Sequence, residues 1–111
     1  MGSKQLQLIE EIKNRLSILT PERIILFGSH ADGSAGADSD IDLIVVLNKD
    51  EAAGSFREKM SSTVKVRKLL ADINRQVALD VLVYSKNEWQ ALVESRSSFS
   101  RDILEKGISL Q

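Results

Sequence analysis

Two aspartates separated by one residue have a spacing that suits the binding of a metal ion. Asp40 and Asp42 stand at the start of an apolar run that continues to Leu47. Side chains alternate along a β-strand, so both carboxylates point to the same face. Neighbouring anions repel each other, and carboxylate oxygens are ligands that suit Mg²⁺ and Mn²⁺. The pair therefore predicts a divalent-metal site at the mouth of a strand over residues 41–47.

A glycine and a serine precede this pair, directly after an apolar strand expected over residues 23–27. Gly28 allows a close backbone approach, and Ser29 is suited to begin a short helix, so free amide hydrogens and a hydroxyl can face an anion. Metal ligands beside an anion-binding turn are typical of a nucleoside triphosphate site. We predict Gly28 and Ser29 as nucleotide-binding residues and 30–39 as the substrate-facing loop.

A third carboxylate, Asp80, interrupts the apolar, β-prone segment 77–84. An ionised group in such a strand needs a compensating charge. If this strand lies beside the one that bears Asp40 and Asp42, three carboxylates converge on one patch, as in two-metal phosphoryl-transfer sites. We therefore predict that Asp40, Asp42 and Asp80 are catalytic residues and ligands of two Mg²⁺ ions, with Mn²⁺ as the substitute.

The order Gly28-Ser29, Asp40-Ile41-Asp42 and a later Asp80 resembles the minimal nucleotidyltransferase (MNT) family of the DNA polymerase β-type superfamily, over the whole chain. The resemblance implies a nucleotidyltransferase fold similar to the polymerase β palm. It also implies transfer of a nucleoside monophosphate, AMP from ATP, to a hydroxyl acceptor. The better understood members are prokaryotic antitoxins that modify an all-helical toxin, which implies a HEPN-type partner protein and a toxin–antitoxin system.

The turn departs from the family pattern. Many members carry Arg shortly after Gly-Ser, whereas the matching positions here read His30-Ala31-Asp32-Gly33, and an acid should weaken the hold on a triphosphate. A catalytically silent antitoxin that neutralises a helical partner by complex formation therefore remains the alternative. A small-molecule nucleotidyltransferase similar to the aminoglycoside-modifying enzymes is less favoured, because those enzymes carry a second domain for the acceptor.

Composition narrows the class of protein further. The chain has 111 residues, 42% hydrophobic and 28% charged, which predicts one domain over residues 1–111. A net charge of −1 gives no general attraction to long nucleic acid or to a membrane surface. The chain has no cysteine, no apolar stretch near the ~20 residues that span a bilayer, and no signal-peptide core. We expect a cytoplasmic protein and leave homo-oligomerisation open.

The hydrophobic periodicity predicts helices over residues 4–19, 55–70, 85–93 and 99–106, and a strand over 77–84 besides the two named above. The expected fold is α/β of the α+β kind, a small mixed sheet of three to four strands with helices mainly on one face and the site on the open face. Residues 108–110 are expected to pair with a sheet edge. We expect a partner to cover the apolar C-terminal side chains Trp89, Phe99, Ile103 and Leu110.

Overall fold

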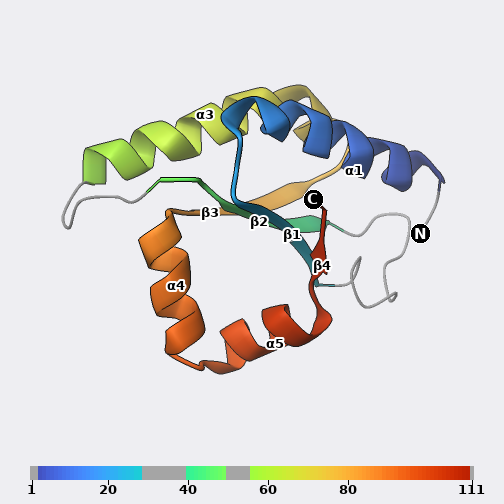
Figure 1. Cartoon of the computed structure of the whole chain (residues 1–111). Coiled ribbons are helices and arrows are strands. Elements are labelled where there is room, and N and C mark those ends of the chain that lie inside the picture. Colours follow the sequence, from blue (N-terminus) through green and yellow to red (C-terminus); the bar gives the residue numbers. More distant parts are fainter. Residues whose placement is uncertain (1–2, 29–39, 50–55, 111) are drawn as a thin grey trace.

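The computed structural model describes residues 3–28, 40–49 and 56–110, so the predictions for Ser29, His30, Asp32 and the loop over 30–39 lie outside the described residues. The elements follow one another as in Figure 1: α1 Ser3–Leu16, the 3-10 turn η1 Ser17–Leu19, β1 Arg23–Phe27, β2 Ile41–Val46, α3 Phe56–Asn74, β3 Leu79–Tyr84, α4 Lys86–Glu94, α5 Ser98–Lys106 and β4 Ile108–Ser109. None of the helices in the described ranges has the length and apolar character needed to cross a bilayer.

The four strands form one mixed sheet in the order β3-β2-β1-β4. β1 pairs antiparallel with β2 and with β4, whereas β2 and β3 are parallel. Parallel neighbours require a crossover, and α3 supplies it. The predicted mixed sheet of three to four strands is confirmed, and so is the pairing of the C-terminal segment with a sheet edge, because Ile108 and Ser109 pair with β1.

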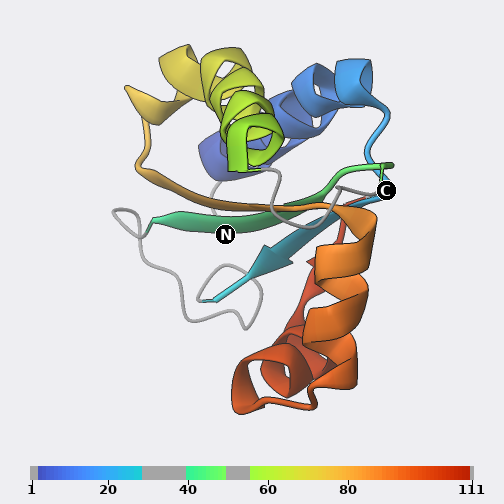
Figure 2. The same cartoon turned by 90° about the vertical axis from the view of Figure 1, so that its left-hand side faces the viewer.

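The two long helices lie on one face of the sheet and the two short helices on the other (Figure 2). Alternate side chains of β1 and β2, such as Leu26 and Leu43, join α1 and α3 in the larger hydrophobic core. The intervening residues, such as Ile25 and Ile44, join Trp89 of α4 in a smaller core. The apolar runs of β1 and β2 follow from this, because both faces of these strands are covered.

Contacts between α1 and α3 include a charged cluster. Arg15 of α1 donates to both carboxylate oxygens of Asp72 on α3, to the carbonyl of Leu69 at 3.2 Å, and to Glu11 at 2.6 Å. The hydrogen bond from Arg15 lowers the pKa of Asp72 to about 2. This bidentate contact fixes the rotation of the two helices relative to each other above the sheet.

The buried side of α3 differs from the prediction. The periodicity of residues 55–70 predicts that Met60 and Val64 lie on the apolar side of this helix together with Val66 and Leu70. In the structure Met60 and Val64 are 50% and 43% exposed. The side chains of α3 that face the core are Ser62, Val66, Leu70 and Ile73. The helix carries apolar residues on more than one side, so the sheet beneath it, rather than the periodicity alone, decides which stripe is buried. The helix also continues to Asn74, beyond the predicted end near residue 70.

The second face is closed by α4 and α5. Ser85 caps α4 in a capping box with Glu88, as the Ser-x-x-Glu pattern predicts. Trp89 and Ile103 are buried in the smaller core, at 7% and 4% exposure. The expectation that a partner covers them was therefore wrong, because the sheet already does so. Phe99 is exposed by 39% and contacts Phe27 edge-on, with ring centroids 6.0 Å apart.

Candidate active site

The carboxylates come together at the end of the sheet where β1 stops and where β2 and β3 begin. In the antiparallel register Phe27 lies opposite Asp42, and in the parallel register Asp42 lies beside Asp80. The condition on which the convergence of the acids depended, that the strand of Asp80 lies beside the strand of Asp42, is met. Gly28 directly follows Phe27, so the turn, Asp42 and Asp80 form a row across three neighbouring strands.

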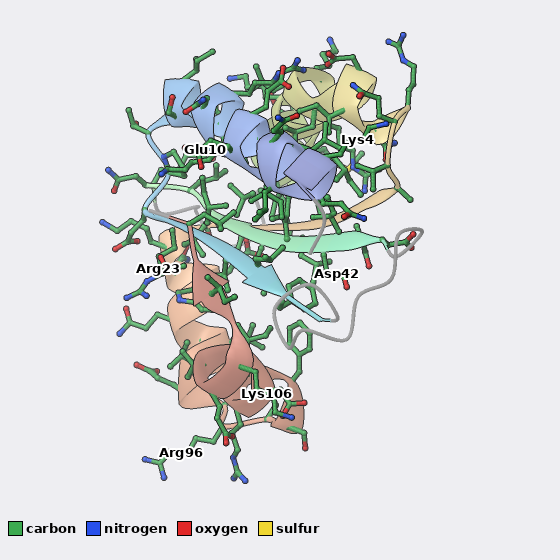
Figure 3. The ribbon with its side chains drawn as sticks, turned by 90° about the vertical axis from the view of Figure 1, so that its right-hand side faces the viewer. Lys4, Glu10, Arg23, Asp42, Arg96 and Lys106 are labelled. Atoms are coloured by element: carbon green, nitrogen blue, oxygen red, sulfur yellow. The ribbon has the colours of Figure 1, made fainter. Side chains whose placement is uncertain are left out.

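This row lies on the face that carries α4 and α5. Ile25 and Phe27 of β1, and Ile44 of β2, contribute to the smaller core on that face. Because side chains alternate along a strand, Asp42 points to the same face as Ile44. Asp80 is paired with Asp42 in the parallel register and therefore points to that face too. Figure 3 shows Asp42 on the side of the sheet from which α5, with Lys106, projects.

Burial of the three acids differs. The side chain of Asp42 is half-buried, while Asp40 and Asp80 are exposed. Phe99 of α5 packs against Phe27 next to Gly28 and borders the site on that side. The short helices therefore cover the centre of this face, and the end that carries the acids stays accessible to a ligand.

Gly28 and Asp42 are in close contact. Gly28 has φ +71°, a left-handed conformation that side chains rarely adopt, and a Cβ at this position would stand 2.3 Å from Oδ2 of Asp42. The carboxylate thus occupies the space that a side chain at position 28 would need. Only glycine allows the backbone after β1 to lie directly against the carboxylate, which brings the predicted phosphate-binding residue Gly28 next to an acid that is predicted to bind metal.

The structure brings together some of the predicted site residues and not all of them. Gly28, Asp42 and Asp80 form the row described above. Asp40 immediately precedes β2, two residues before Asp42, so alternation places it on the same face as Asp42. Ser29 lies outside the described residues. Across residues 3–28, 40–49 and 56–110, no three His, Asp or Glu side chains form a ready-made metal site.

The donor set fits Mg²⁺ nonetheless. Two carboxylates in register on adjacent strands supply hard, negatively charged oxygens whose mutual repulsion a divalent cation would relieve. Protein-bound Mg²⁺ is usually held by one or two carboxylates together with substrate phosphates and water, rather than by a complete protein cage. A pair of acids beside an anion-binding turn therefore has the composition expected of such a site.

Two hollows border the row, and the sequence did not reveal their linings. One, of about 330 Å³, lies at the edge of β3 and joins Asp80 to Arg67 and Asn74 of α3. The other, of about 270 Å³, lies beside Gly28 between Phe27 and Phe99. The apolar periodicity of α3 favoured a different face of that helix, so only the three-dimensional placement shows that Arg67 and Asp80 line the same hollow.

No curated protein sequence matches the chain. Among solved structures, one described as "Crystal structure of the toxin-antitoxin with AMP-PNP" is similar with a TM-score of 0.46 and 20% identity, over 93% of this chain and 72% of that chain. A similarity of this strength says nothing about activity.

A family model described as "Nucleotidyltransferase domain" matches residues 7–110. The matched range contains β1, the turn at Gly28, and the two strands, β2 and β3, whose register aligns Asp42 with Asp80. The match spans nearly the whole chain, and the chain therefore belongs to the nucleotidyltransferase domain family.

Proposed function

We propose that this protein transfers a nucleoside monophosphate, AMP from ATP, to a hydroxyl group of a partner protein. The observation that carries the proposal is the row formed by Gly28, Asp42 and Asp80 across β1, β2 and β3. It combines an anion-binding turn, a metal-binding acid and a second acid within neighbouring strands. These are the parts that in-line transfer of a nucleotidyl group needs.

In this proposal Asp40, Asp42 and Asp80 hold Mg²⁺, as two ions. When bound, divalent ions neutralise the charge of the triphosphate and polarise its α-phosphate. Gly28 and Ser29 hold the β- and γ-phosphates through backbone N–H groups and the hydroxyl, and so stabilise the leaving group. The close contact of Gly28 with Asp42 sets the distance between the phosphate-binding turn and the metal-binding acid.

In this proposal Asp80 accepts the proton of the acceptor hydroxyl. The acceptor hydroxyl oxygen forms a bond to the α-phosphorus, and the bond from that phosphorus to the oxygen bridging to the β-phosphate breaks. Pyrophosphate leaves with the electron pair of the broken bond, and the hydroxyl proton passes to the Asp80 carboxylate. The exposure of Asp80 at the border of the site supports this assignment, because an acceptor can reach it from solvent.

The partner is proposed to be a HEPN-type helical toxin, which makes this protein the antitoxin of a toxin–antitoxin pair. This part of the proposal rests on the resemblance of the Gly28-Ser29 and Asp40-Ile41-Asp42 motifs to the MNT antitoxins. A hydroxyl of Tyr, Ser or Thr on the toxin would be the acceptor. AMP on that side chain would inactivate the toxin.

Calorimetry of ATP binding tests the site. We expect wild-type protein to bind ATP in the presence of Mg²⁺ and not in its absence, because the triphosphate is repelled by bare carboxylates. The double variant Asp40→Asn with Asp42→Asn should lose binding, whereas Glu105→Gln, a control at an exposed acid on α5, should retain it. Equal affinity with and without Mg²⁺ would remove the metal from the proposal.

The second candidate is a silent antitoxin that acts by covering its partner. The absence of a ready-made group of three acids in the described part of the chain is the observation that keeps it open.

A purified HEPN-type partner, mixed with this protein, ATP and Mg²⁺, distinguishes the two. The enzyme predicts a partner mass increased by AMP, and a rate that Asp80→Ala lowers at least about a hundredfold, ~2.7 kcal/mol of transition-state stabilisation. The silent candidate is supported if the complex forms without a shift in the mass of the partner. It also requires that Asp80→Ala neutralises the partner as well as the wild type does.

A further inference from the structure

Among the described residues, no strand lies beside the outer edge of β3, which presents backbone N–H and C=O groups. β3 is the last strand of the sheet. Ile41 N–H donates to the Ala78 carbonyl at 2.9 Å, and Leu47 N–H donates to the Tyr84 carbonyl at 2.8 Å. In a parallel pair, residues whose N–H and C=O face the neighbouring strand alternate with residues whose groups face away. The backbone groups of Leu79, Val81 and Val83 therefore point away from β2.

Only one of these outward groups has a described partner. The N–H of Leu79 donates to Oδ1 of Asn74 at 2.9 Å, which ties the start of β3 to the end of α3. Within residues 3–28, 40–49 and 56–110, the N–H and C=O of Val81 have no recorded acceptor or donor. Val81 directly follows Asp80, so the open part of the edge begins next to that carboxylate.

A groove runs along this edge. Its walls are the stripe of α3 formed by Arg67, Leu70, Ala71 and Asn74, and the segment Leu79–Val81 of β3, around a hollow of about 330 Å³. The α3 residues are spaced by three, one and three positions, which places them on a single face of the helix. The middle of the helical wall is apolar, and its two ends carry a guanidinium and an amide. This composition suits an extended peptide rather than a free metal ion or phosphate.

The order of groups across the sheet indicates from which side the acceptor arrives. On the proposed function, the leaving pyrophosphate lies at the Gly28 turn on β1, and the metal-binding Asp42 lies on β2 between that turn and Asp80. In-line displacement requires the attacking oxygen to stand opposite the leaving group. The acceptor therefore comes from the β3 side, where the free edge and the groove lie.

We propose that the acceptor docks as an extended segment along the outer edge of β3, adding a strand that pairs with the backbone of Val81 and presents its hydroxyl to Asp80. Strand addition of this kind takes affinity from main-chain hydrogen bonds and specificity from side-chain contacts. Arg67 supplies the contact: it lines the groove, and the described residues offer it no ion pair. The acceptor segment accordingly carries an acidic residue close to its hydroxyl residue. This inference rests on the proposed function.

Synthetic peptides provide the probe. The panel consists of fluorescent peptides about eight residues long, the length of a β-strand, with alternating Val and Thr, one Tyr, and either Glu or Lys directly next to the Tyr. Adjacent positions are used because Asp80 and Arg67 lie on opposite faces of the sheet, and neighbouring side chains of a strand point to opposite faces. Fluorescence anisotropy with the full chain and Mg²⁺-ATP measures binding. Glu peptides should bind at least about tenfold more tightly than Lys peptides, since a charged pair in a groove is worth a factor of that size.

Methylation of the peptide backbone distinguishes strand addition from non-specific binding. Each Glu peptide is made with N-methyl groups on one alternate set of residues or on the other. Only one set faces β3, so one methylated form should lose binding by about tenfold or more while the other retains it. Equal effects of the two sets, or no binding that depends on methylation anywhere in the panel, would overturn the proposal.

Variants of the protein locate the contact. Arg67→Glu should invert the preference so that Lys peptides bind more tightly, whereas Lys68→Ala, at the next position of α3 and outside the groove, should leave it unchanged. Val81→Pro removes the outward N–H without breaking the ladder to β2 and should weaken all peptides. If Val81→Pro does not fold, as judged by its melting curve, the Arg67→Glu inversion decides the outcome.

The same samples separate this inference from the proposed function. Mg²⁺-ATP binding, measured by calorimetry, should be equal in wild type, Arg67→Glu and Val81→Pro. Peptide binding at the edge without any Mg²⁺-ATP binding would refute the proposed function and leave a peptide-binding edge. Normal Mg²⁺-ATP binding without edge-specific peptide binding would refute the inference alone. A wild-type dimer in sedimentation that Val81→Pro converts to monomer would assign the edge to a second copy of the chain and overturn the proposal as well.

Discussion

Gly28 shows how one residue couples the fold to the site. Its left-handed φ of +71° and its distance from the Asp42 carboxylate leave no room for a side chain. For Gly28→Ala we expect a loss of about 1–2 kcal/mol in the free energy of unfolding, the usual cost of a left-handed conformation for a residue with a Cβ. Displacement of the carboxylate should also abolish Mg²⁺-ATP binding.

Gly107→Ala is the matched control. A Cβ at Gly107 would stand 2.5 Å from the Ile103 carbonyl, so this variant should also be destabilised, but by a clash away from the acids. Urea unfolding and calorimetry measure both quantities in both variants. Unchanged nucleotide affinity in Gly28→Ala would show that the contact between Gly28 and Asp42 has no part in binding.

The pair of acids makes a second prediction at this scale. Asp42 and Asp80 lie side by side on one face of the sheet, and like charges in such positions are destabilising by a few tenths to about 1 kcal/mol. Asp80→Asn should therefore raise the melting temperature slightly. Millimolar Mg²⁺ should raise that of the wild type and of the control Asp102→Asn, but not that of Asp80→Asn. A clear destabilisation by Asp80→Asn would identify this acid as a structural hydrogen-bonding group.

Among the elements, the junction of α1 and α3 predicts how stability depends on pH. The hydrogen bonds from Arg15 lower the pKa of Asp72 from an ordinary value of 3.8 to about 2. A group whose pKa is lower in the folded state stabilises the protein above its unfolded pKa and loses that contribution as the pH falls through the folded pKa. The contribution of Asp72 is therefore complete above about pH 4 and is lost between pH 4 and pH 2.

Asp72→Asn tests this dependence. The variant should be less stable than wild type at neutral pH, and the difference should shrink between pH 4 and pH 2 in urea unfolding. Glu10→Gln, an exposed acid on α1 whose 3.8 Å contact with Lys13 stays within the helix, is the control. A difference between wild type and Asp72→Asn that is independent of pH would show that the carboxylate does not act through its charge.

Much of the element structure could be predicted, for local reasons. The bounds of β1 coincide with the predicted strand, and the Ser85 capping box marks the start of α4, because both depend on short sequence patterns. The strands that carry Asp42 and Asp80 could be predicted from their apolar residues, whereas their adjacency was only a condition of the prediction and is met by the parallel register. The roles of Asp40 and Ser29 in catalysis and binding stay predictions.

Other features depend on contacts that the sequence pattern does not contain. The buried stripe of α3 could not be chosen from periodicity, since Met60 and Val64 are as apolar as Val66 and Leu70. The bidentate contact of Arg15 with Asp72 joins residues far apart in the chain. The groove between Arg67 and Val81 needs both the rotation of α3 and the register of β3, so it emerges only in three dimensions.

For the whole molecule, β2 is one of the strands that contribute side chains to both hydrophobic cores. Leu43 belongs to the larger core and Ile44 to the smaller one, and both side chains are fully buried. Truncation of such side chains leaves a cavity, so we expect Leu43→Ala and Ile44→Ala each to cost about 2–5 kcal/mol in the free energy of unfolding. Leu104→Ala, at a side chain that is 55% exposed, should cost less than about 0.5 kcal/mol.

Urea unfolding compares the three variants. A cost for Ile44→Ala as small as that for Leu104→Ala would mean that α4 and α5 are only loosely attached to the sheet. That result would matter for the site as well, because Ile44 lies two residues from Asp42 on the same face.

The parallel pairing of β2 and β3 also determines when the site comes into existence as the chain folds. β1 and β2 are the closest antiparallel strands in the sequence, whereas Asp80 reaches Asp42 only after the whole of α3 has crossed over the sheet. Pairing across such a long separation is slow, because the entropy of closing the loop must be overcome before the contacts form. On the proposed function, recovery of Mg²⁺-ATP binding after dilution from urea would therefore follow the docking of β3, and a nucleotide would be bound only by chains in which β3 has already paired with β2.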